Sequence, residues 1–125
     1  MSRIHCFPVT IGGSDRFFLV DTVRGPLSEP GYVILPNGLI AQWIVGSTDP
    51  ADNTEPSQTI NYPITFPNAV LAAFVSMNIS TPTEFCNHWY QTSQITTSQL
   101  TVQRNRYGSN TMIATTTPHV FVIGW

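Results

Sequence analysis

The sequence has 125 residues, of which 42% are hydrophobic and 10% are charged, with five Arg, no Lys and a net charge of −2. This length suits one domain with its own core, and the apolar content is too high for a disordered tail. So few cations, dispersed along the chain, exclude nucleic acid and anionic membranes as electrostatic partners. The longest apolar run, residues 69–75, is too short to span a bilayer, so we expect no membrane insertion.

The composition predicts an all-β fold. Val, Ile and Thr total 37 residues, whereas Leu, Ala, Glu and Lys total 15. Side chains branched at Cβ favour a pleated sheet over a helix, and the ten Pro and eight Gly interrupt any long helical stretch. Turn signals recur every 8 to 14 residues, which is typical of a small antiparallel β-sandwich.

The N-terminal part reads as a β-hairpin followed by a connector. Two apolar segments, 4–11 and 17–23, flank Gly12-Gly13, which suits a tight turn. A Pro- and Gly-rich stretch then ends near residue 31. We therefore divide the chain into an attachment or interface segment, 1–31, and a β-sandwich domain, 32–125.

The sandwich domain is predicted to begin with a hairpin and a loop. Strands 32–35 and 39–45 flank Asn37-Gly38, a strong turn signal. The polar stretch 46–57 has almost no apolar side chain, so it is expected to be an exposed, mobile loop.

The second half alternates strands with turns, and its segment 69–75 is apolar on both faces, as in a sandwich core or a subunit interface. Within the last strand, Val120 and Val122 are expected on one face and Phe121 and Ile123 on the other. A turn is expected over 104–110. The expected strands are 59–62, 69–79, 85–90, 95–103, 111–116 and 119–125.

No pattern in the chain indicates catalysis, a metal or a cofactor. Cys6 and Cys86 match no metal or redox spacing, and they are read as two free thiols, with a disulfide as the alternative. No nucleophile elbow and no phosphate-binding glycine loop is present. The three histidines are isolated in sequence, and the seven carboxylates fall mainly in turns and loops. A glycan depolymerase would depend on Asp49, Asp52 and Glu55.

Two clusters suit binding instead, because amide, imidazole and guanidinium groups stand beside aromatic rings. Sugars present apolar C–H faces that stack on aromatic rings and hydroxyls that pair with such polar groups, and the same side chains are enriched at protein interfaces. Core or subunit packing remains the alternative for the first cluster, and an ordinary exposed turn for the second. The clusters are Asn87, His88, Trp89 and Tyr90, and Arg104, Asn105, Arg106 and Tyr107.

Three segments resemble the C-terminal domain family of bacteriophage tail fibres. LPNGLIAQW at 35–43 is similar to its "NGLI-QW" opening, YPITFPNA at 62–69 to its "P-I-x-F-P-N-A" signature, and VFVIGW at 120–125 to its closing strand. Ile44 stands where the family usually has Gly, and 119–121 lacks a common Trp. No binding residue carries over by motif.

The resemblance implies a fibre-tip β-sandwich, similar in plan to trimeric H-type lectins. As a homotrimer it would bury the strand 69–75 and the C-terminal strand, and repeat one weak site three times. The expected location is the distal end of a virion tail fibre. The expected partners are a bacterial surface glycan or outer-membrane protein and, through the N-terminal segment, other tail or fibre proteins. The alternative is a structural component that caps or joins a fibre without touching a receptor.

Overall fold

The computed structural model describes residues 4–11, 14–21, 29–81, 87–109 and 111–125, and these form nine β-strands and no helix. None of the described segments could therefore cross a membrane as a helix. The strands are β1 (Ile4–Ile11), β2 (Ser14–Asp21), β3 (Gly31–Ile34), β4 (Ile40–Val45), β5 (Ser57–Asn61), β6 (Val70–Ile79), β7 (His88–Ser93), β8 (Gln99–Arg106) and β9 (Thr116–Gly124).

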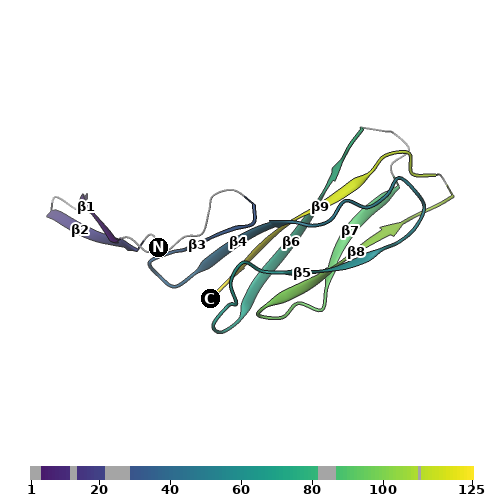
Figure 1. The fold of residues 1–125 in the computed structure, drawn as a ribbon. Coiled ribbons are helices and arrows are strands. Elements are labelled where there is room, and N and C mark those ends of the chain that lie inside the picture. The colour runs from purple at the N-terminus through teal and green to yellow at the C-terminus, as the bar shows by residue number, and fades with distance from the viewer. Residues whose placement is uncertain (1–3, 12–13, 22–28, 82–86, 110) are drawn as a thin grey trace.

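Two antiparallel sheets form a sandwich, and β1 and β2 pair separately as a hairpin (Figure 1). The first sheet has the order β3-β4-β9-β6 and the second the order β5-β8-β7. Alternate side chains point into the space between the sheets, and the most deeply buried include Leu100, Val102 and Val122. The expected all-β sandwich with a preceding hairpin is confirmed.

The outer faces of the two sheets differ in chemistry. On the second sheet, registered rows of Ser, Thr, Asn and Gln face outward, such as Ser57, Gln103 and Gln91. On the first sheet, Trp43, Phe121 and Phe74 form one outward row across three strands. The outer face of the second sheet is therefore mainly polar, whereas an aromatic row crosses the outer face of the first sheet.

Several strand boundaries differ from the predicted ones. The turn expected over 104–110 is wrong at its start, because β8 continues to Arg106 and begins only at Gln99. Residues 95–98, which were expected to begin a strand, belong to a turn over 94–98. In this turn the Thr96 hydroxyl accepts hydrogen bonds from the Ser98 and Gln99 amides. Gly12-Gly13, Cys86 and the side chain of Cys6 lie outside the described residues.

The strand expected over 111–116 is also wrong, and the last strand begins earlier than expected, at Thr116. The prediction placed Pro118 before the strand, because proline lacks the amide hydrogen needed inside a sheet. The structure accommodates Pro118 because pairing of β9 with β4 ends at His119. Beyond that point β6 continues its pairing as far as Thr116, and on the other side Asp49 forms an isolated bridge with Thr116.

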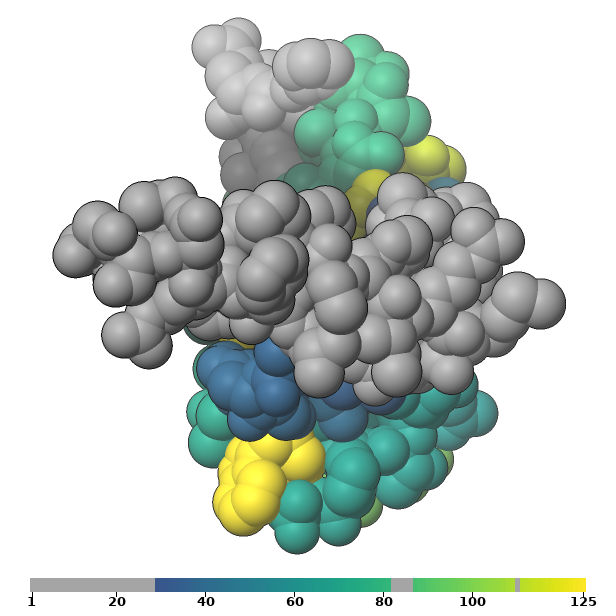
Figure 2. Space-filling model, turned by 90° about the vertical axis from the view of Figure 1, so that its left-hand side faces the viewer, coloured from purple at the N-terminus to yellow at the C-terminus, as the bar shows by residue number. Residues whose placement is uncertain are grey.

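The three segments that carry the tail fibre resemblance meet at one end of the sandwich. Gln42 is fully buried, and its side-chain amide exchanges two hydrogen bonds with the Ile64 backbone, at 2.9 and 3.0 Å. Trp125 N donates to Ala69 O at 3.0 Å, and the Ala69 amide donates back to Trp125 O. Figure 2 views the molecule from this end, with the C-terminal residues in yellow beside the blue and teal segments. The motifs are therefore structural.

We expect Gly124→Ala to lower the free energy of unfolding by about 1–3 kcal/mol, the usual cost of overpacking. A Cβ at Gly124 would lie 2.3 Å from the Ala69 carbonyl oxygen and 2.6 Å from a Phe66 ring carbon. Ser76→Ala is the control, because Ser76 is an exposed residue of the neighbouring strand β6 and surface changes usually cost within about 0.5 kcal/mol. Urea unfolding of both variants tests this, and equal midpoints would contradict it.

Candidate ligand-binding surface

The pairing of β7 with β8 divides the eight predicted binding residues into two sets. The register places His88 opposite Arg106, Trp89 opposite Asn105 and Tyr90 opposite Arg104. Successive rows of an antiparallel pair point to opposite faces. Two sets result: Asn87, Trp89, Asn105 and Tyr107 lie on the outward side, and His88, Tyr90, Arg104 and Arg106 on the inward side.

The outward set forms an aromatic–amide patch, by which we mean Asn87, Trp89, Asn105 and Tyr107. Trp89 is 45% exposed and Tyr107 is 80% exposed, both high for large rings. They are diagonal neighbours across the strand pair, a separation on the order of 7–8 Å that aromatic side chains bridge. The Asn87 side-chain amide donates to the Tyr107 carbonyl, and the Tyr107 amide donates to Asn87 O. These two hydrogen bonds hold Asn87 and Tyr107 together just beyond the end of β8.

Of the inward set, His88, Tyr90 and Arg104 are buried and Arg106 is partly exposed. Arg104 is 0% exposed, and its guanidinium donates to the carbonyls of Pro50 and Thr54, at 2.8 and 2.9 Å, and to the Thr116 hydroxyl at 3.1 Å. It also forms an ion pair with Asp52 at 2.9 Å. Every direction of the guanidinium is used inside the protein. Arg104 therefore positions the surface and does not bind.

Tyr90 belongs to the same buried network. Its hydroxyl donates to Asp49 Oδ2 at 2.5 Å and lies 2.9 Å from the Thr116 hydroxyl oxygen. Burial raises the pKa of the Tyr90 phenol, and donation to Asp49 raises it further. Tyr90 thus stays protonated and is a fixed donor.

The loop over 46–57 is exposed at most of its residues, as predicted, but hydrogen bonds anchor it to the rest of the domain. Asp49 is only 7% exposed and pairs with Thr116 through two backbone hydrogen bonds. At the start of the loop, Ser47 N donates to Gln58 Oε1 at 2.7 Å. Arg104 binds the carbonyls of Pro50 and Thr54 in the middle of the loop. Mobility was expected because the loop has almost no apolar side chain, whereas the structure anchors it through the buried guanidinium of Arg104.

The pKa values of Asp52 and His88 are also shifted in this part of the domain. Hydrogen bonds from Thr54, with the nearby Arg104 charge, lower the pKa of the Asp52 carboxyl below its usual 3.8. Burial lowers the pKa of His88 below its usual 6.5, and the charges of Arg104 and Arg106 lower it further. Hence His88 is neutral in the folded protein near pH 7.

We expect stability to fall as the pH drops below 6.5, because the unfolded state then binds a proton at His88 that the folded state resists. Above pH 6.5 both states are neutral at this residue and the effect vanishes. The loss linked to Asp52 falls in a separate window, below pH 3.8. Urea unfolding between pH 5 and 8 measures the change. His88→Gln should remove the fall in stability below pH 6.5 and His119→Gln should retain it; a fall that is unchanged in His88→Gln would contradict the assignment.

The groups that metal or acid–base chemistry would need can be located in the described part of the chain. Among the residues that the structure describes, no three His, Cys, Asp or Glu side chains gather as a metal site would require. The carboxylates that a depolymerase would use are committed: Asp49 accepts from Tyr90, Asp52 pairs with Arg104, and Glu55 accepts from the Arg106 amide at 3.0 Å.

Comparison with known proteins identifies the family. A family model described as "Putative tail fiber protein gp53-like, C-terminal" matches residues 34–125. The chain belongs to this tail fibre family. The matched region runs from the last residue of β3 to the C-terminus and leaves β1 and β2 outside it. A search of curated proteins finds no match.

Solved pyocin fibres share the fold of this tail fibre domain. The R1 pyocin fibre of P. aeruginosa matches with a TM-score of 0.66 and 18% identity, over 80% of this chain and 27% of that one. An N-truncated R1-type pyocin tail fibre gives 0.65 and 18%, over 80% and 83%. The R2 pyocin fibre of P. aeruginosa gives 0.59 and 22%, over 80% and 25%. The chain thus spans about a quarter of the first of these structures.

Proposed function

We propose that this tail fibre domain attaches a virion to its host by binding a surface glycan or an outer-membrane protein. The observation that carries the proposal is the aromatic–amide patch. Two exposed rings stand next to the partly exposed side-chain amide of Asn105 on an otherwise polar sheet face. The Asn87 amide braces Tyr107 from below, and its Oδ1 is buried. Rings that stack on apolar surfaces and amides that pair with hydroxyls are the chemistry of sugar recognition and of protein interfaces alike.

We also propose that this domain forms a homotrimer at the distal end of a tail fibre. A threefold assembly repeats the patch three times, so weak individual sites act together. The wall behind the patch is rigid because Arg104 and Tyr90 connect it to the loop over 46–57. A surface held in its binding conformation loses less entropy on binding.

Adsorption to whole cells tests this function. Fluorescently labelled protein is incubated with a panel of bacterial strains and with cells stripped enzymatically of surface glycan or of exposed protein. The proposal expects saturable binding to some strains, abolished by one of the two treatments. The proposal is refuted if the protein shows no saturable binding to any of the strains that particles carrying this chain infect.

A second candidate function is a joint or cap within the fibre, favoured by the hairpin of β1 and β2. This hairpin forms its own two-stranded sheet and lies outside the family match. It would hold the domain to other tail or fibre proteins. Deleting residues 1–30 should then detach the chain from particles and leave β3–β9 folded. Retention of the shortened chain on particles would exclude this role.

A further inference from the structure

The aromatic–amide patch continues into two rows of polar side chains on the same sheet face. Outward positions recur at every second residue of a strand, so these rows follow the row of Trp89 and Asn105. Each row crosses β7, β8 and β5 in register. We call the two rows the polar strip, and they consist of Gln91, Gln103 and Ser57, and of Ser93, Thr101 and Thr59.

The polar strip is open to solvent and extends the patch along the strands. Its side chains on β5 and β7 are exposed, and those on the central strand β8 are partly exposed. Strands rise about 3.4 Å per residue and lie about 4.8 Å apart, so the face from Trp89 to Ser93 is about 14 Å long and about 10 Å wide. A single sugar ring would cover only part of this length.

Within β5, β7 and β8, all of whose residues the structure describes, no charged side chain points outward. The Arg104 side chain is fully buried on the inward side. Edge strands often carry charged side chains, Lys especially, yet the outward residues of the edges β5 and β7 are neutral. Charges of opposite sign meet at the margin of the patch, where Glu55 Oε1 accepts from the Arg106 amide at 3.0 Å.

The chemistry of the polar strip matches sugar hydroxyls. Side-chain amides and hydroxyls supply both donors and acceptors, as sugar hydroxyls do. They pair with a neutral sugar without removing a charge from water. An acidic glycan would require Arg or Lys for its carboxylate or phosphate groups. A protein partner would favour aromatic, Met and Arg side chains and disfavour Ser.

Two members of the polar strip are already held by hydrogen bonds. Gln103 Nε2 donates to Glu55 O at 2.7 Å, and Thr101 Oγ1 donates to Gln94 Oε1 at 3.3 Å. Side chains fixed before binding lose less entropy when a ligand arrives. The central strand therefore offers a prepared surface for a ligand that lies along it.

We propose that the polar strip and the aromatic–amide patch form one elongated site for a neutral glycan chain. Trp89 and Tyr107 stack on one sugar ring, and the polar strip binds the hydroxyls of the sugars that follow. The inference rests on the proposed attachment function and names the ligand class of its site: an uncharged chain of several sugars.

Fragments of a surface polysaccharide provide the probe. Polysaccharide from a strain that adsorbs the protein is cleaved with mild acid, separated into neutral and acidic fragments, and sorted by length. Isothermal titration calorimetry should show binding of neutral fragments, with higher affinity for longer ones. Replacing Gln91 and Ser93 by Ala should weaken binding of the longer fragments about 4- to 100-fold, the loss of two hydrogen bonds. Binding of the shortest fragments should stay unchanged, whereas Trp89→Ala should weaken both.

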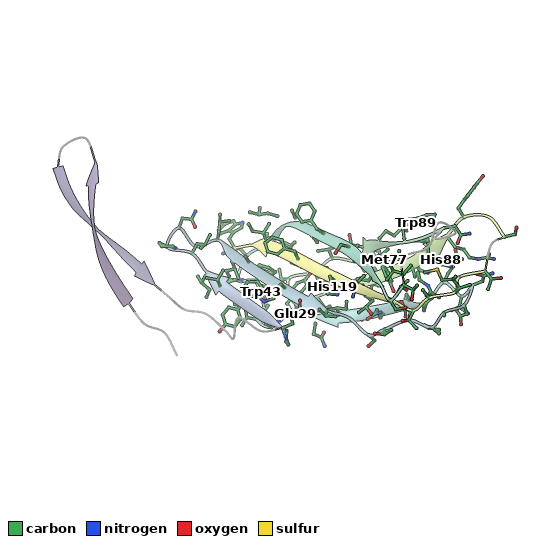
Figure 3. All side chains as sticks on the ribbon, turned by 90° about the horizontal axis from the view of Figure 1, so that it is seen from above. Glu29, Trp43, Met77, His88, Trp89 and His119 are labelled. Atoms are coloured by element: carbon green, nitrogen blue, oxygen red, sulfur yellow. The ribbon has the colours of Figure 1, made fainter. Side chains whose placement is uncertain are left out.

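The matched control replaces Asn78 and Ser76 by Ala. These residues are an exposed amide and an exposed hydroxyl two positions apart on β6, in the other sheet. Ser76 lines a cleft with Trp43 and His119, and Figure 3 shows Trp43 and His119 at a distance from Trp89. The control variant should bind every fragment like the wild type.

Four results would overturn the proposal: preference for acidic fragments, equal affinity for all lengths, unchanged binding by the Gln91 and Ser93 variant, or loss of cell adsorption after protease treatment alone. In each case adsorption of the wild type to cells would leave the attachment function standing, whereas a wild type that adsorbs to no host strain would overturn both. Circular dichroism melting curves establish that the variants are folded. Replacing Ser57 and Thr59 by Ala provides a second test on the opposite edge strand.

Discussion

Arg104→Met should destabilise the domain by about 3–5 kcal/mol, the largest effect that we expect from one substitution. Met keeps an unbranched apolar stem, although it is shorter than Arg, and removes every guanidinium donor. The carbonyls of Pro50 and Thr54 and the Thr116 hydroxyl then lose a partner inside the protein. Domains are stable by only about 5–15 kcal/mol, so this loss is a large fraction. Urea unfolding measures it.

Arg106→Met is the matched control for Arg104→Met. Arg106 lies two residues further along the same strand, is partly exposed, and donates from its side chain to Gly108 O at 3.1 Å. Its loss should cost less than about 1 kcal/mol, the usual range for a surface change. Similar losses for the two variants would show that burial of Arg104 is not what holds the loop.

Replacing Trp89 and Tyr107 together by Ala should reduce adsorption to host cells by at least about 100-fold. If the two rings contribute about 1.4 kcal/mol at one site, the affinity of that site falls about tenfold. In a trimer the losses at three sites multiply, which gives up to about 1,000-fold. Flow cytometry of labelled protein over a concentration series measures this.

Ile113→Ala is the control for this pair, because Ile113 is 66% exposed but is not part of the patch. It should bind cells like the wild type. The double variant should keep the oligomeric state and the melting temperature of the wild type, since neither ring belongs to the buried core. Unchanged adsorption by a folded double variant would exclude the aromatic–amide patch as the contact surface.

Local patterns in the sequence predicted much of the fold. Asn37-Gly38 gave the correct turn, with Gly38 at a φ of 88°. Alternation placed Val120 and Val122 on one face of the strand and Phe121 on the other, and the structure shows that the first face is the buried one. These features depend on neighbouring residues alone, and the period of two in a strand is enough to orient them.

The anchoring of the loop by Arg104 depends on contacts between residues far apart in the sequence. Alternation from Leu100 and Val102 already points Arg104 inward, and following that signal would have removed Arg104 from the list of ligand contacts. Its partners lie about 50 positions earlier in the chain, however. Nothing in the local sequence near Asp52 or Thr54 indicates that a guanidinium will reach them. The anchored loop therefore had to be found in the structure.

The most direct test of the central claim, that this tail fibre domain contacts the host surface, is a competition for adsorption. Host cells are incubated with excess purified domain before particles that carry this chain are added, and unadsorbed particles are counted. The account predicts that particle adsorption falls with increasing domain concentration, and that the Trp89 and Tyr107 double variant fails to compete. Particle adsorption that is unaffected by folded, trimeric wild-type domain would contradict it.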